Sequence, residues 1–138
     1  VEYVDPADPK KVTRLYSSAR FQPSKIAYGW IPAHPSLFLR RRVYDRFGLF
    51  DSSFRIAGDF EFLSRIFWNS DLRWTYLPET LVRMREGGLS NQSFKNRWKT
   101  NLEILRACRK NKIPTNLFKL SLRYPLKLLE YAKTKRVA

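Results

Sequence analysis

The spacing of hydrophobic residues changes along the chain, and the first part shows the short alternation that is typical of β-strands. Residues 1–4 alternate loosely and stop at Asp5-Pro6, and residues 12–16 repeat the pattern, so we expect a hairpin. Alternation returns in three short segments, which are predicted as strands at 36–40, 73–77 and 81–85.

A helical period replaces this alternation after Gly58. We predict a helix over Asp59–Trp68 with one buried face. That face consists of Phe60, Leu63, Ile66 and Phe67. A shorter helical turn is expected at 43–47, because the following Gly48 is a natural C-terminal stop.

Two more helices are predicted towards the C-terminus. The first begins at Asn91 or Ser93 and continues to about residue 111, where Pro114 ends it. Its apolar stripe is Phe94, Trp98, Leu102, Leu105 and Cys108. Thr115 or Asn116 can cap the second, which covers 117–133 and should kink at Pro125. The chain therefore has the pattern of an α/β or α+β core followed by two C-terminal helices.

The charge of the chain is strongly positive and unevenly distributed. The formal net charge is +15, and from residue 91 onward 13 basic residues face two acids, Glu103 and Glu130. Such a segment attracts polyanions, which include nucleic acid, an anionic membrane surface and a phosphorylated substrate. Because Cys108 is the only cysteine, no internal disulfide is expected, and a reducing, cytosolic compartment is favoured. No apolar run approaches the roughly 20 residues that span a bilayer.

Three motifs occur in an order that resembles bacterial family 2 glycosyltransferases of surface-polysaccharide biosynthesis. The first is the run from Gly29 to Phe38, GWIPAHPSLF. The second combines Gly48-Leu49-Phe50-Asp51 with the run from Ile56 to Glu61, IAGDFE. The third is the run from Met84 to Ser90, MREGGLS. Each piece is weak alone, but together they resemble the C-terminal, acceptor-side portion of that family over about residues 1–112.

The resemblance implies a partial GT-A-like mixed sheet with flanking helices, a nucleotide-diphospho-sugar donor and inversion at the anomeric carbon. It also implies a divalent metal, Mg²⁺ or Mn²⁺, held by an Asp-x-Asp motif. This sequence has no counterpart of that motif, since Asp5-Pro6-Ala7-Asp8 has the wrong spacing. We therefore expect no metal ligands here and a nucleotide-binding half upstream of Val1, and we divide the chain into a transferase portion at 1–112 and a basic helical tail at 113–138.

Asp59 is the candidate catalytic residue. Inverting transfer needs one base to take the proton from an acceptor hydroxyl, and a single ionised carboxylate is sufficient. Asp59 follows a glycine and starts a predicted helix, whose N-terminus stabilises a negative charge. Its position alone favours a plain helix cap. The resemblance reverses that preference, because Asp59 falls where the base of the family lies.

His34 and Glu61 are candidate substrate contacts. His34 is the only histidine and lies between Pro32 and Pro35, and by resemblance we take it as an acceptor or phosphate contact. No second or third ligand stands near it at metal-site spacing. Glu61 precedes Arg65 by four residues, so a structural ion pair is its expected job and an acceptor contact the alternative.

A further group of candidates lies at the third motif. Arg83 and Arg85 alternate onto one face of a predicted strand that leads into Gly87-Gly88. Two guanidinium groups and a glycine loop could grip a diphosphate leaving group, and Ser90 would cap the next helix. The alternative is a solvated strand face with a simple turn.

The tail offers a possible membrane contact. Phe118, Leu122 and Leu126 share one side of the predicted last helix, and lysines and an arginine line another. An interfacial helix has this pattern, but so does a helix that packs on the body with its basic face in water. An enzyme with a glycan or lipid-linked acceptor would then be cytoplasmic, peripheral on the inner face of the cytoplasmic membrane.

Two other functions compete with the transferase. A nucleic-acid-binding module would suit the net charge and the aromatic content, but the aromatic residues fall at core spacings and no known binding signature is present. A non-catalytic basic module that binds glycan or anionic membrane is the second alternative. The upstream coding sequence separates it from the enzyme.

Overall fold

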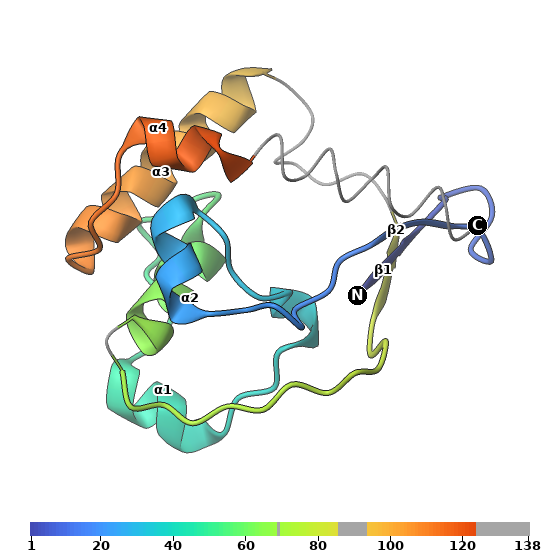
Figure 1. Ribbon diagram of the computed structural model, residues 1–138, viewed down its shortest axis with the longest axis horizontal. Helices are drawn as coiled ribbons and strands as arrows, with labels where there is room; N and C mark the ends of the chain where they lie inside the picture. Colours follow the sequence, from blue (N-terminus) through green and yellow to red (C-terminus); the bar gives the residue numbers. More distant parts are fainter. Residues whose placement is uncertain (69, 86–93, 124–138) are drawn as a thin grey trace.

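A computed structural model describes residues 1–68, 70–85 and 94–123 of the chain. A small sheet lies at one side of the molecule and a group of helices at the other, joined by extended segments (Figure 1). This combination of a mixed sheet and helices is the α/β class that the sequence pattern predicts.

The sheet has three strands in the order β2-β1-β3. Strand β1 (Glu2–Val4) pairs antiparallel with β2 (Val12–Leu15), which confirms the predicted hairpin. On its other side β1 pairs parallel with β3 (Arg83–Arg85), the C-terminal part of the strand expected at 81–85. The parallel pair ties the start of the chain to a segment some 80 residues later.

The helical part consists of four α-helices and two short 3₁₀ helices within the described ranges. The α-helices are α1 (Arg41–Phe47), α2 (Gly58–Phe67), α3 (Phe94–Lys110) and α4 (Leu117–Ser121). The 3₁₀ helices are η1 (Pro23–Tyr28) and η2 (His34–Ser36). Gly48 ends α1 with a φ of 80°, a left-handed conformation that favours glycine, as predicted.

Helix α2 is the centre of the core. All four residues of its predicted apolar face are buried, and Phe62 is buried as well. The Phe62 ring lies between Tyr44 and Phe50, with centroid distances of 5.3 and 4.5 Å. Aromatic contacts on this second side therefore make α2 buried around most of its circumference, and they fix it against α1 and the following loop.

The predicted apolar stripe of α3 is buried only over the C-terminal half of the helix. Leu105 and Cys108 are buried, whereas Trp98 and Leu102 are 53% and 44% exposed. With a rise of about 1.5 Å per residue, α3 is longer by roughly 10 Å than α2, so α2 cannot cover it all. The prediction is therefore wrong for the middle of the stripe, and the side chain of Phe94 lies outside the described set.

Helix α4 packs against η1 and α3. Its N-cap is Asn116, whose side chain accepts a hydrogen bond from the Lys119 backbone, as expected for one of the two predicted caps. Leu120 is completely buried and packs in the core cluster that contains η1 and α2 residues. Pro125 and the rest of the predicted last helix lie outside the described residues.

Two predicted strands are absent from the described structure. Residues 36–40 end the 3₁₀ helix η2 and then lead irregularly into α1, because Pro35 starts a tight turn there. Residues 73–77 form no strand, and all five are exposed rather than alternately buried. Alternation favours an extended conformation, but a strand also needs a neighbour to bond with, and none is present at that place. Among the described helices, none is long and apolar enough to span a bilayer.

Candidate functional site

Asp59 lies in the first turn of α2, with its side chain one-third exposed. The N-cap of the helix is Ala57, which has no side chain that can bond the free N–H groups. Asp59 Oδ1 accepts a hydrogen bond of 2.7 Å from the Phe60 backbone, so one carboxylate oxygen is held by the helix. The other oxygen, Oδ2, is turned to a neighbour from a distant part of the sequence.

That neighbour is His34, whose Nδ1 lies 3.1 Å from Asp59 Oδ2. The His34 side chain is 52% exposed, so one side of the imidazole contacts the Asp59 carboxylate and the rest is accessible to solvent. When Nδ1 carries its proton it donates to Asp59, and this leaves Nε2 free towards the solution. The two residues that the sequence motifs singled out independently are thus brought together, as a carboxylate and an imidazole at a helix N-terminus.

The His34 segment is held in place by the polar side chains before it. Ser18 Oγ accepts a hydrogen bond of 2.9 Å from the Ala33 backbone, and Tyr16 Oη donates one of 2.6 Å to Ile31 O. Ser36 Oγ donates to Ala33 O at 3.0 Å and closes the 3₁₀ turn. These bonds position the imidazole without touching it.

Glu103 of α3 holds the loop that leads into Asp59. Its Oε2 accepts hydrogen bonds from the backbones of Ile56 and Ala57, both 2.8 Å long, and its Oε1 accepts one of 3.2 Å from Arg55. Partial burial acts to raise the pKa of Glu103, but the three N–H groups outweigh it and hold that pKa below its ordinary value. A carboxylate from another helix thereby fixes the backbone of the three residues that lead into α2.

Glu61 has a structural position, which agrees with the expected ion pair and not with the alternative of an acceptor contact. Its side chain is completely buried, and its carboxylate lies 3.0 Å from both Arg65 Nη2 and Lys110 Nζ. Asn111 Nδ2 donates to it at 3.3 Å. The predicted pair with Arg65 is confirmed. A bound molecule could not reach this carboxylate without displacing three partners.

Arg83 and Arg85 lie on the sheet, away from α2 (Figure 1). Both side chains are on the exposed face of β3, as the alternation predicts. Arg83 Nε is engaged by Glu2 Oε2 at 2.8 Å, whereas Arg85 has no ion pair within the described residues. The other candidates from this motif, Gly87, Gly88 and Ser90, lie outside the described residues.

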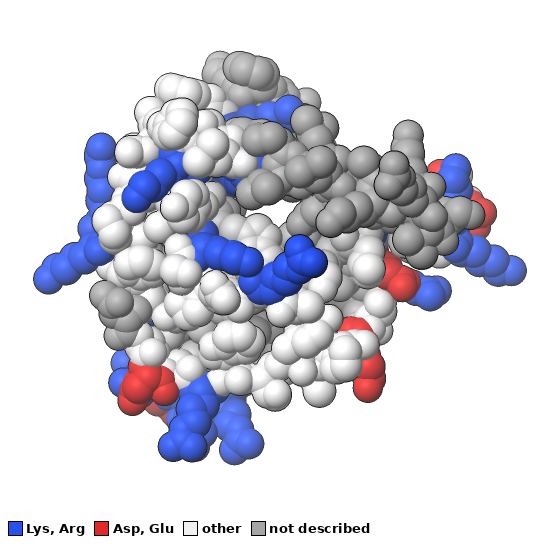
Figure 2. All heavy atoms as spheres, in the orientation of Figure 1, with Lys and Arg blue, Asp and Glu red and all other residues white. Residues whose placement is uncertain are grey.

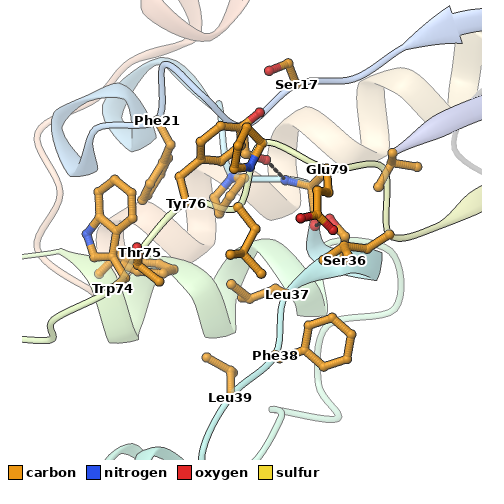
Figure 3. A pocket seen from close by; sticks show the side chains of 18 of the residues that line it. Ser17, Phe21, Ser36, Leu37, Phe38, Leu39, Trp74, Thr75, Tyr76 and Glu79 are labelled. Atoms are coloured by element: carbon orange, nitrogen blue, oxygen red, sulfur yellow. Dashed lines mark hydrogen bonds between the residues drawn. The ribbon is translucent and has the colours of Figure 1, made fainter.

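A groove of about 680 Å³ runs beside the His34 segment. Ala33 and Ser36, which flank His34 and Pro35, contribute to its lining. Aromatic side chains of Phe21, Trp74 and Tyr76 lie along one side and the run Leu37–Leu39 along the other (Figure 3). His34 and Asp59 are not themselves part of the groove lining, which reaches the pair only through Ala33 and Ser36 beside His34.

The polar residues do not form a metal site in the described part of the chain. No three His, Cys, Asp or Glu side chains gather closely enough there to hold a cation. Asp59 and His34 supply two ligand groups, and the next acid along α2, Glu61, is committed to Arg65 and Lys110. We accordingly derive no step through a metal.

Sequence reasoning missed the contribution of α3 to the site. The signal that could have shown it is the isolation of Glu103, the one acid in a helix of basic residues. An acid kept in such surroundings usually has specific partners. The role of Lys110 was not visible in the sequence either, because its ion pairs with Asp51 and Glu61 depend on tertiary contacts.

Comparisons with protein-family models, with curated proteins and with solved structures return no match to this chain.

Proposed function

We propose that this chain forms the acceptor side of an inverting glycosyltransferase of the GT-A type, with Asp59 as its catalytic base. The donor would be a nucleotide-diphospho-sugar bound by a nucleotide-binding half outside these residues, and the acceptor a glycan or lipid-linked glycan of polysaccharide biosynthesis. The observation that carries the proposal is the pairing of Asp59 with His34 at 3.1 Å at the start of α2.

The geometry supports a base in three ways. One oxygen of Asp59 is fixed by the Phe60 backbone, so the carboxylate cannot rotate freely. The side chain is still one-third exposed, which leaves room for an acceptor hydroxyl. The preceding loop is held by Glu103, so the carboxylate is carried on a rigid element rather than on a free loop.

In the proposed reaction the acceptor oxygen attacks the anomeric carbon of the donor while Asp59 takes the hydroxyl proton. A bond forms between that oxygen and carbon, and the bond from the carbon to the phosphate oxygen breaks. The electron pair leaves with the nucleoside diphosphate, and attack from the opposite side inverts the anomeric centre.

His34 has a supporting role in this mechanism. Its Nδ1 donates to Asp59 and orients the carboxylate, so its removal should slow transfer without abolishing it. The same geometry also allows the reverse division of labour, in which His34 Nε2 is the base and Asp59 holds the imidazole. Replacement of His34 by Gln distinguishes the two roles.

The experiment is sugar transfer by variants of the protein that includes its nucleotide-binding half. Asp59→Asn keeps the shape of the side chain but cannot accept a proton, and we expect transfer to fall by about 10²–10⁴-fold. Donor binding should stay within about twofold. His34→Gln should lose about tenfold, because Asp59 remains and loses only an orienting hydrogen bond. Asp45→Asn is the matched control, since Asp45 lies on the exposed face of α1 and only contacts Arg41 at 3.9 Å.

The outcomes separate the possibilities. Normal turnover in Asp59→Asn would remove this residue from the base role. Equal losses in Asp59→Asn and His34→Gln, with intact folding, would instead assign the base role to His34. Absence of transfer by the unchanged protein would favour a non-catalytic basic module.

A further inference from the structure

The segment 73–81 lies extended across one face of the molecule, and its backbone pairs with no other strand among the described residues. In Figure 1 it is the long yellow-green trace that runs from the end of α2 towards β3. Every residue in it is exposed, and none belongs to a helix or a strand. Within the described residues, no backbone N–H or C=O of 73–81 takes part in a hydrogen bond.

The sequence of residues 73–77 nevertheless has the alternating pattern of a strand. Trp74 and Tyr76, two residues apart, both line the groove, and Trp74 packs its ring edge against Phe21 at 5.3 Å. Figure 3 shows these rings beside Phe21, opposite Leu37. Arg73, Thr75 and Leu77 line the same groove. The segment is therefore held by side-chain packing, while its main-chain donors and acceptors have no hydrogen-bond partner among the described residues.

We infer that residues 73–77 are one half of a β-pairing, completed by an extended strand from a polypeptide outside these 138 residues. A strand edge with free main-chain groups is the standard template for adding another strand. The groove beside it, of about 680 Å³, provides space for alternate apolar side chains of that strand. Pro78 has no N–H and limits the pairing at its C-terminal end.

The charged residues of the groove indicate the composition of the incoming strand. The charged residues that line the groove are Arg40, Arg42, Arg73 and Glu79. Neither Arg40 nor Arg42 has an ion pair within the part of the chain that the structure describes. The incoming strand should therefore alternate apolar with acidic residues. A second copy of this chain is a poor candidate, because each copy carries a net charge of +15 and the two would repel.

This inference does not depend on the proposed transferase chemistry, and its test uses no activity. A peptide in which Val and Glu alternate is fused ahead of Val1, which itself lines the groove, through a Gly/Ser linker of about a dozen residues. Such a linker spans roughly 20 Å and gives an effective concentration in the millimolar range. Amide hydrogen exchange is then measured residue by residue.

We expect alternate amides within 73–77 to exchange at least about tenfold more slowly in the fusion, because they become bonded to the added strand. The control fusion has the same composition, with its Glu and Val residues in two blocks, and should leave these amides unchanged. Thr75→Pro and Tyr76→Pro each remove one donor from an already extended segment, and at least one should abolish the slowing.

Three results would overturn the inference. One is exchange that is equally fast in the alternating fusion and in the unfused protein. Another is equal slowing by the alternating and the block peptide, which would indicate nonspecific association. The third is slowing in the unfused protein that grows with concentration together with a dimeric mass, which would identify the occupant as a second copy.

Discussion

At the scale of single residues, three acidic side chains have specific partners in the fold. Asp59 faces His34, Glu103 holds the preceding loop, and Glu61 is buried among cationic and amide groups. The three carboxylates are chemically alike but have different surroundings. Asp59 belongs to an exposed pair, Glu103 bonds the backbone of a loop, and Glu61 belongs to a buried ion pair. Only the first has both a fixed position and room for a substrate.

The role of Glu61 leads to a prediction on stability. Glu61→Gln removes a buried negative charge but leaves Arg65 and Lys110 beside it, and breaking a buried pair in this way costs about 3 kcal/mol. Urea denaturation at neutral pH measures the loss. Asp45→Asn is the control, since an exposed pair contributes about 0.5 kcal/mol. A loss as small as that of the control would contradict a structural role for Glu61.

Glu61→Gln should also change how the free energy of unfolding depends on pH. Burial acts to raise the pKa of Glu61, but hydrogen bonds from Arg65, Lys110 and Asn111 outweigh it and hold that pKa below its ordinary value of 4.5. Because the folded pKa is the lower one, this carboxylate stabilises the fold above pH 4.5, and the contribution is lost as pH falls through the folded pKa. The difference in unfolding free energy between the natural protein and Glu61→Gln should therefore shrink in acid. A difference that stays constant would exclude this linkage.

At the scale of elements, the sequence predicted α1, α2, the hairpin and the Asn116 cap because each depends on local signals. Gly48 stops α1, the period of four apolar residues places α2, and Asn116 begins α4. The strand at 73–77 was wrong for a reason that local pattern cannot reveal. Its sequence alternates as in a strand. A strand, however, forms only when another strand lies beside it, and a local pattern carries no information on that neighbour.

For the candidate site, the sequence indicated some of the residues but not how they lie in space. His34 and Asp59 were named from separate motifs, but only the fold brings them within 3.1 Å of one another. Glu103 escaped notice because a carboxylate that bonds three backbone groups across 46 to 48 residues leaves no periodic trace in the sequence. The exposure of Trp98 and Leu102 depends likewise on the length of the helix that covers α3.

The packing of α3 can be probed through its cysteine. Cys108 is completely buried, and burial raises the pKa of its thiol to about 12. Since the thiolate is the reactive form, labelling by a thiol reagent at pH 8 should be at least about 100-fold slower in the native protein than in urea. Equal rates in the two conditions would indicate that α3 does not pack on α2 in solution.

At the scale of the whole molecule, positive charge is spread widely over the surface. Figure 2 shows Lys and Arg side chains across the visible face, whereas Asp and Glu appear in a few places towards its edge. Such a surface suits an anionic membrane, which the proposed cytoplasmic transferase with a lipid-linked acceptor would need to approach.

The truncation point for a test of the tail follows from the burial of Leu120. Deletion of 117–138 would remove Leu120, which is completely buried, and would destabilise the fold. Deletion of 124–138 retains Leu120 and Arg123 and removes four basic residues and one acid. With about 1 kcal/mol for each of the three net charges, affinity for anionic vesicles should fall by roughly 100-fold.

Co-sedimentation measures that loss, and neutral vesicles serve as the control. Unchanged binding after deletion of 124–138 would eliminate the tail as a membrane contact, and the remaining net charge of +12 on 1–123 would then have to account for the binding.

The most direct test of the central claim replaces the acceptor by azide, a nucleophile that has no proton to lose. The measurement is the rate at which Asp59→Asn, in the protein with its nucleotide-binding half, transfers sugar to azide and to the hydroxyl acceptor. If Asp59 removes the proton, the variant should fail with the hydroxyl acceptor but form the glycosyl azide as fast as the natural protein. Equal failure with both nucleophiles, or undiminished transfer to the hydroxyl, would contradict the assignment of Asp59 as the base.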